Sequence, residues 1–381
     1  MTKAVSYECG LTIVARDEHG MRCLLDDKRP VFFFEGTPEQ MGAAHGRLFK
    51  DGVVDCCRKV EMVGTIHTMG KKVSYANKVA EQKRRSYMYV PDRFFREMNA
   101  VADATGESVE LIHQLNFLFE LFHCSGVVAR GKATVDGNVR HGCITDYMRD
   151  FGIYAYAGLF VFLPTEKVNG RALNNWVSLS YASMAGSVTC MNEKGLAIGE
   201  KGGGGERKWD GLPMTFLMRR MMEECSTVDE AIALMKSVPL TCDYYYTLSD
   251  ASNNIAAVVA KSQSEEPVYV IHPNEDYPDW MPNGATLPKK FEDVVYLSGP
   301  GERIDTLAER IGSVYGKIDT TAVIEMMKRP VCKTTNLHNA VFEPVTRDFY
   351  FAEARRKALA ADEPYYKGNI HEFIEFYRRN K

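Results

Sequence analysis

Cys124 is the residue whose type and position best fit covalent chemistry. The chain has ten cysteines, with no CxxC pair and no metal-ligand spacing, and most of them are expected to be buried as small apolar side chains. Cys124 stands where an apolar-rich helical stretch, residues 111–122, gives way to predicted strands. A thiolate placed there can attack an acyl carbon and form a covalent intermediate. The alternative is an inert buried thiol.

Other motifs give little support for a metal or a cofactor. His67, His113, His272 and His338 lie far apart in the sequence, without an HxxxH or HExxH pattern. The run Gly202–Gly205 lacks the Lys-Ser/Thr of a phosphate-binding loop and the spacing of a dinucleotide fingerprint. We therefore expect no metal and no cofactor. We interpret the glycine run as a loop near the site where Cys124 would attack an acyl carbon.

Composition limits the classes of partner. The 381 residues carry 47 lysines and arginines against 50 aspartates and glutamates, a formal charge of -3, so no overall field favours nucleic acid or an anionic membrane. No apolar stretch approaches the roughly 20 residues that span a bilayer, and the first residues do not have the order of a secretory signal. We expect a cytoplasmic protein that acts on a small molecule, alone or as a homo-oligomer.

Local patterns predict the elements that position Cys124. Thr37, with proline and glutamate after it, marks a helix N-terminus, and residues 53–122 are mostly helical. Asp136-Gly137, between the strands at 127–129 and 139–141, predicts a β-hairpin because Asp-Gly readily adopts positive φ. Strands, then two helices, then more strands follow. This grouping predicts an α+β fold with mainly antiparallel sheets.

Five short motifs occur in an order that is typical of one family. They are residues 34–46 (FEGTPEQMGAAHG), Cys124-Ser125 with the hairpin up to Tyr147, residues 190–196 (CMNEKGL), Ser298 to Arg303 ahead of a helix, and residues 339–344 (NAVFEP). Over residues 31–352 the chain resembles the acyl-coenzyme A:isopenicillin N acyltransferase-like family and the related choloylglycine hydrolases, which are N-terminal-nucleophile hydrolases.

The resemblance implies a fold and an activity. The fold is a four-layer αββα sandwich, with residues 1–123 as an α-rich pro-section and residues 124–381 as the catalytic core. Autoproteolysis between His123 and Cys124 would leave two chains. The activity is hydrolysis of a non-peptide C–N amide bond, or transfer of its acyl group, with an acyl amide or acyl donor as substrate. Cys124 is the expected nucleophile, and Asp146 is the carboxylate that orients its amine.

Chemistry supports the same interpretation of Cys124. Once cut from His123, this residue would carry an α-amino group with a reference pKa of about 8. The amine can take the thiol proton, and the resulting ammonium can protonate the leaving amine. Base and nucleophile would then belong to one residue. For Asp146 the alternative is a carboxylate that only caps a turn.

Three further residues are candidates for substrate binding. Arg303 could bind a substrate carboxylate or support the site, and a salt bridge at a helix end is the alternative. Asn274 is the available side-chain amide for an oxyanion donor, although an asparagine after proline is typical of a turn. Tyr147, which follows Asp146 in the motif, is the third candidate.

Departures from the family pattern leave two alternative hypotheses open. Where relatives have RNxD, this chain has Cys143-Ile144-Thr145-Asp146, so the arginine of that motif is missing. Arg140 lies nearby, but its side chain would point in a different direction from the family's arginine unless the strand is bulged. One alternative is an uncut enzyme in which Cys124 pairs with a histidine such as His141. The other is a catalytically inactive relative that only binds a ligand.

Overall fold

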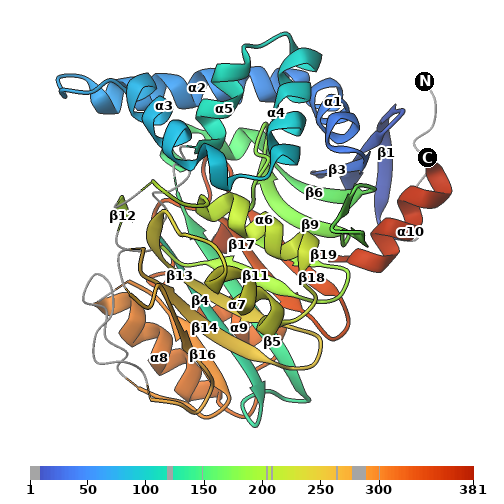
Figure 1. The fold of residues 1–381 in the computed structure, drawn as a ribbon. Helices are drawn as coiled ribbons and strands as arrows, with labels where there is room; N and C mark the ends of the chain where they lie inside the picture. Colours follow the sequence, from blue (N-terminus) through green and yellow to red (C-terminus); the bar gives the residue numbers. More distant parts are fainter. Residues whose placement is uncertain are drawn as a thin grey trace.

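Two large sheets lie face to face between two layers of helices (Figure 1). The computed structural model describes residues 9–117, 123–147, 149–202, 205–206, 209–262, 265–276, 289–299 and 301–381. None of the helices within these ranges is long and apolar enough to cross a membrane.

The first sheet has 11 strands in the part of the chain that the structure describes, in the order β1-β2-β3-β6-β9-β10-β11-β13-β14-β15, with β12 beside β13. Strands β3 and β6 run parallel, and the other neighbouring pairs are antiparallel. The strands are β1 (Leu11–Asp17), β2 (Gly20–Leu25), β3 (Arg29–Gly36), β6 (Ala157–Pro164), β9 (Trp176–Tyr181), β10 (Thr189–Asn192), β11 (Ala197–Glu200), β12 (Gly205–Glu206), β13 (Cys242–Ser249), β14 (Ile255–Ala260) and β15 (Val268–Ile271).

The second sheet is antiparallel and has the order β16-β4-β5-β17-β18-β19 among the described strands. These strands are β4 (His123–Gly131), β5 (Gly137–Asp146), β16 (Val294–Leu297), β17 (Asn336–Glu343), β18 (Asp348–Glu353) and β19 (Tyr366–Asn369). A small separate hairpin joins β7 (Lys167–Val168) to β8 (Arg171–Ala172).

Helices cover both outer faces. The first helical layer comprises α1 (Pro38–Leu48), α2 (Lys50–Thr68), α3 (Tyr75–Ser86), α4 (Asp92–Thr105), α5 (Val109–Phe117), α6 (Met214–Glu224) and α7 (Val228–Lys236). On the opposite side lie α8 (Glu302–Val314) and α9 (Thr320–Met326), and α10 (Ile370–Asn380) ends the chain.

Burial on both faces explains the central position of the first sheet. In β3, Phe32 and Phe34 point into the cluster shared with the first helices, whereas Val31 and Phe33 pack on the side of the second sheet. A strand that is apolar at every position must be covered twice, because successive side chains point to opposite faces. Each fully buried phenylalanine contributes on the order of 2 kcal/mol. The run of four apolar residues therefore fixes a sheet inside the molecule.

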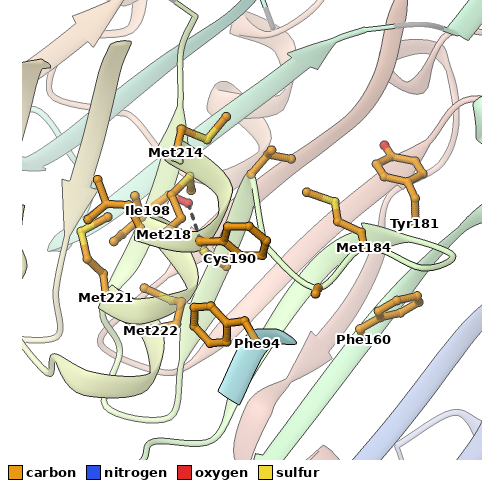
Figure 2. Close-up of a cluster of buried hydrophobic side chains, with 14 of the residues drawn as sticks. Phe94, Phe160, Tyr181, Met184, Cys190, Ile198, Met214, Met218, Met221 and Met222 are labelled. Carbon is orange, nitrogen blue, oxygen red and sulfur yellow. Dashed lines mark hydrogen bonds between the residues drawn. The ribbon is translucent and has the colours of Figure 1, made fainter. Parts of the chain in front are cut away.

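Methionines of α6 fill the space above this sheet (Figure 2). Met214, Met218 and Met221 lie against the buried face that carries Cys190 and Ile198. Unbranched thioether side chains suit such irregular gaps. The packing anchors α6 directly over β10 and β11, the strands that lead to the candidate site.

The outer clusters complete the layering. Val127, Ala129 and Ile144 of the second sheet pack on α8 and α9, whereas Val128 and Val139 pack on β14 of the first sheet. The order of layers is thus helices, sheet, sheet, helices. This order confirms the α+β class and the αββα sandwich that the sequence predicts.

The 34–46 motif ties the first helix to the sheets. Thr37 caps α1, and the reciprocal bond from the backbone of Thr37 to Gln40 completes a capping box. Gly42 is required by a close helix contact, since a Cβ there would lie 2.2 Å from the carbonyl oxygen of Glu97 in α4. The ring of His45 accepts a bond from Ser183 N at 3.1 Å.

The predicted hairpin forms with the expected turn. Gly137 has φ +78°, and Val128 pairs with His141 across β4 and β5. The front section is α-rich between residues 38 and 117, and its first three strands join the large sheet. Part of the expected glycine loop, residues 203–204, lies outside the described residues.

Candidate active site

Cys124 lies near the start of β4, and its side chain points into the gap between the two sheets. Its backbone pairs with Thr145 of β5. The thiol donates a hydrogen bond to Glu200 Oε2 of the first sheet, with Sγ and Oε2 3.2 Å apart. Only 1% of Cys124 is exposed. The thiol is therefore held against one carboxyl group in a site that excludes water.

Glu200 is the last residue of β11 and supplies that carboxyl group. It is buried, its Oε1 accepts a bond from Gly202 N, and its backbone N donates to Val188 O at 3.2 Å. Burial raises the pKa of the Glu200 carboxyl to about 7, because the charged form is desolvated. A carboxyl with this pKa can exchange a proton near neutral pH.

The thiol itself resists ionisation. Burial raises the pKa of Cys124 well above its ordinary value, and the charge of Glu200 adds to this effect. The charge of Lys201 acts in the opposite direction and lowers the pKa of the thiol. Nucleophilic attack by this sulfur therefore requires a base to remove its proton.

Lys201 extends between the sheets beside this pair, and 2% of it is exposed. A Cβ at Gly126 would lie 2.1 Å from Lys201 Cε, and one at Gly199 would lie 2.4 Å from Nζ. Glycine at these two positions thus makes room for the lysine side chain. The Sγ of Cys143 also lies beside Gly199, so the ammonium and this second thiol are neighbours.

Asp146 lies on the other face of the β4–β5 pair. Its Oδ2 is 2.6 Å from Nη2 of Arg303, and its Oδ1 accepts a bond from Lys333 N at 3.0 Å. Burial raises the pKa of Asp146, and the charge of Arg303 opposes that rise. Asp146 pairs with His123 in the sheet register, so Asp146 lies directly beside the residue that precedes Cys124.

The side chain of Arg303 makes its contacts within the protein, on the same side of the site as Asp146. Its Nη2 also donates to Ser125 Oγ at 2.7 Å, and its Nε donates to Val331 O at 2.7 Å. The hydroxyl of Ser125 is 2.7 Å from that of Ser298. The guanidinium of Arg303 thus joins the residue after Cys124 to Asp146.

Other expected residues are not brought to the thiol. Asn274 has φ +75°, and its Oδ1 accepts a bond from Asp293 N at 2.8 Å in a turn at the far end of β4. Arg140 pairs with Asp136 at 2.9 Å and Glu343 at 3.4 Å.

His141 faces the first sheet four positions along β5 from the residue that pairs with Cys124. Its ring nitrogens are 2.8 Å from Ser249 Oγ and 2.8 Å from Thr247 Oγ1. Burial lowers the pKa of His141. The imidazole is therefore neutral and is occupied by two hydroxyl groups.

Tyr147 lies on the wall of a cavity of about 340 Å³ between α2 and α3. Tyr75, Val79 and Trp209 line it as well. Cys124 is not among the described lining residues, so the thiol is enclosed while the chain through His123 is intact. Among the described residues, no group of three or more His, Cys, Asp or Glu side chains could hold a metal ion.

Sequence reasoning missed Glu200 and Lys201. Glu200 is the last residue of β11, and Lys201 directly follows it. The available signal was the pair of charges directly after an apolar strand, where the next residues are glycines. Glutamate and lysine are seldom fully buried unless they are paired, so this signal is equally compatible with an exposed turn.

Comparison with known proteins supports the expected family. Residues 149–276 match the family model of acyl-coenzyme A:6-aminopenicillanic acid acyl-transferase, which confirms the resemblance predicted from the sequence. The matched segment contains Glu200 and Lys201 and begins after Cys124 and Asp146. The chain is also 24% identical to protein dcd1A of Dictyostelium discoideum over 347 residues, which are 83% of this chain and 76% of that protein.

Two solved structures are similar at low identity. An N-acylethanolamine-hydrolyzing acid amidase ortholog of Caenorhabditis elegans has a TM-score of 0.43 and 14% identity, covering 58% of this chain and 93% of its own. A mutant of the conjugated bile acid hydrolase of Clostridium perfringens has a TM-score of 0.43 and 14% identity, covering 65% of this chain and 93% of its own.

Proposed function

We propose that this protein is a cysteine hydrolase or acyltransferase of the N-terminal-nucleophile type that acts on a non-peptide C–N amide bond. Cys124 is the nucleophile, and the chain matures by cutting its own backbone between His123 and Cys124. The observation that carries this proposal is the buried hydrogen bond between the Cys124 thiol and Glu200, at 3.2 Å. Through this contact, the carboxyl group of Glu200 can accept the thiol proton before Cys124 has a free amine.

In the cutting step, Glu200 accepts the proton of the thiol, and the sulfur attacks the carbonyl carbon of His123. The C–N bond between the two residues breaks, the nitrogen of Cys124 takes a proton from Glu200, and a thioester remains. Water then hydrolyses the thioester, leaving a carboxylate on His123 and a free thiol and amine on Cys124. The raised pKa of Glu200, about 7, suits both transfers.

In turnover, the new α-amine takes over as the base. It removes the thiol proton, the sulfur attacks the substrate's acyl carbon, and the ammonium protonates the departing amine nitrogen. Water or an acceptor amine resolves the acyl-enzyme. Asp146, held by Arg303 at 2.6 Å, is proposed to orient the ammonium from the opposite face of the strand.

Buried ion pairs would hold the two chains together after the cut. Arg219 of α6 is 2.6 Å from Glu97 of α4 and 2.7 Å from Glu223, and all three are buried. Arg93 adds a link to Glu223 at 3.0 Å. Since β3 also pairs with β6 in the large sheet, the front section remains an integral part of the fold.

The geometry favours Glu200 over His141 as the first proton acceptor. Glu200 contacts the thiol directly, whereas the ring of His141 bonds to Ser249 and Thr247. In the thiol–imidazole alternative, His141→Ala would abolish activity in a folded protein. In the present proposal, Glu200→Gln is the damaging change, and His141→Ala affects stability alone.

Trapping of the acyl-enzyme tests the proposed activity. The protein is incubated with a panel of N-acyl amides and an acyl thioester, and each cysteine is mapped by mass spectrometry. We expect an acyl adduct on Cys124, absent from Cys124→Ala and retained in Cys143→Ala, the matched change of a neighbouring buried thiol. An adduct that survives Cys124→Ala would refute the proposal. Ligand binding without any adduct would support the inactive relative instead.

A further inference from the structure

Exposed apolar side chains are concentrated at one end of the first helical layer. Of the ten large hydrophobic residues that are exposed in the described chain, six lie between residues 62 and 88, so they are not scattered at random. Met62, Ile66, Met69 and Val73 are exposed by 53%, 60%, 73% and 51%. We call the surface formed by these four residues with Lys71 and Lys72 the α2–α3 tip; it surrounds the turn between α2 and α3 (Figure 1).

The α2–α3 tip is also strongly basic. Residues 59–88, which carry the tip, contain seven lysines and arginines and two glutamates, a net charge of +5 in a chain whose overall charge is -3. Two of these cations pair with carboxylates outside the segment, Lys83 with Glu110 and Arg85 with Asp210, whereas among the described residues the lysines of the tip itself do not. Lys71 contacts His67 at 3.0 Å, and neither Lys71 nor Lys72 forms an ion pair with another described residue. The near balance of the whole chain, from which we expected no membrane partner, conceals this local excess.

Two adjoining cavities open at the tip. The apolar cavity of about 340 Å³ has the exposed residues Met62, Ile66 and Phe151 at its rim and extends to Tyr147, the residue after Asp146. A second cavity of about 450 Å³ has four basic residues in its described lining, Lys71, Lys72, Lys78 and Arg85, against one acidic residue, Glu81. The two cavities share Thr68, Lys78, Gln82 and Trp209 as lining residues. An apolar site therefore lies directly beside a cationic one.

We propose that the α2–α3 tip docks on the surface of an anionic lipid bilayer, with a lipid headgroup in the basic cavity and an acyl chain in the apolar one. Apolar side chains ringed by lysines are suited to the boundary between headgroups and acyl chains. A protein partner would explain the exposed apolar residues, but not the adjoining basic and apolar cavities. The further step, that a substrate's acyl chain enters from the bilayer past Tyr147, rests on the proposed function.

Vesicle sedimentation of the full chain tests the docking. The probes are phosphatidylcholine vesicles with and without phosphatidylserine. We expect binding to the anionic vesicles that weakens with salt. Each lysine near such a surface contributes about fivefold to affinity, so K71E/K72E should weaken binding about twentyfold or more. M69D should weaken binding as well. The matched controls are V135D, for an exposed apolar residue elsewhere, and K317E/K357E, and both should bind as the parent does.

Separate readouts distinguish this proposal from the proposed activity. Vesicle binding needs no turnover, and M69D should hydrolyse a short soluble amide at the parent rate. Binding that K71E/K72E and M69D leave unchanged, or the absence of binding to anionic vesicles, would overturn the docking. So would analytical ultracentrifugation showing that the tip joins two copies of the chain and that M69D separates them.

Discussion

The thiol of Cys124 and the carboxyl group of Glu200 meet across the interface of the two sheets, with Sγ 3.2 Å from Oε2. The two residues lie 76 positions apart in the sequence, and both are buried. Burial raises the pKa values of both groups. The carboxylate of Glu200 is therefore a stronger base than water, and it accepts the thiol proton more readily than water does. Under the proposed function, this pair acts in the intact chain, before a free amine exists.

Glu200→Gln should slow the cutting of the chain at least about a hundredfold, because general-base catalysis contributes roughly that factor or more. In the parent, the rate should rise with pH and level off above about 7, where Glu200 is ionised. Peptide mass mapping over time at several pH values measures this. The control is Glu353→Gln, which neutralises another buried carboxyl with a pKa raised to about 7. Cutting of Glu200→Gln at the parent rate would contradict the role of Glu200.

Glu200 should also make stability depend on pH. Its folded pKa of about 7 is raised above the ordinary 4.5, so its favourable contribution is complete below about pH 4.5 and is lost as pH rises to about 7. Glu200→Gln lacks this loss. Between pH 4.5 and pH 8, the free energy of unfolding of the variant should therefore rise by about 3 kcal/mol relative to that of the parent. Urea unfolding at both pH values tests this, and a stability difference that stays constant with pH would argue against the shift.

Arg303→Met should leave Asp146 buried without its cation, at a cost of about 3 kcal/mol in the free energy of unfolding. Arg303→Lys should recover part of this loss, because the charge remains although the bond to Ser125 or Val331 is lost. Thermal or urea unfolding provides the readout. In a double-variant cycle with Asp146→Asn, we expect strong coupling. Additive effects of the two changes would show that the contact contributes little.

Lys201→Met should separate stability from thiol reactivity. A buried ammonium is expensive to desolvate, so an apolar side chain of similar length should leave the free energy of unfolding within about 1 kcal/mol or raise it. The positive charge that lowers the pKa of Cys124 would be lost. In protein already cut at His123, we expect alkylation of Cys124, followed by mass spectrometry, to slow several-fold. Unchanged alkylation of a stable variant would remove Lys201 from the electrostatics of the site.

The elements near Cys124 could be predicted because their signals are local. The Asp-Gly turn and the cap at Thr37 both form as the sequence indicates. The final strand β19 and helix α10 were not predicted, because the patterns that we interpreted end at residue 352. The alternation of apolar and polar residues and the capping motifs depend on residues that are close in the chain, so they can be recognised in a single sequence.

The site itself could be predicted only in part. Cys124 and Asp146 follow from the family resemblance, which aligns the hairpin. Glu200 reaches the thiol only because β11 lies in one sheet and β4 in the other, and such a contact between sheets leaves no spacing rule in the sequence. The turn at Asn274 is the alternative that the preceding proline indicates, but its bond to Asp293 joins residues 19 positions apart, and no local pattern shows such a contact.

Intact-mass spectrometry of the purified protein tests the central claim most directly. The parent chain should yield two fragments, one ending at His123 and one beginning at Cys124, and Cys124→Ala should remain a single chain of 381 residues. A parent protein that remains one full-length chain while turning over an amide at its full rate would contradict the account.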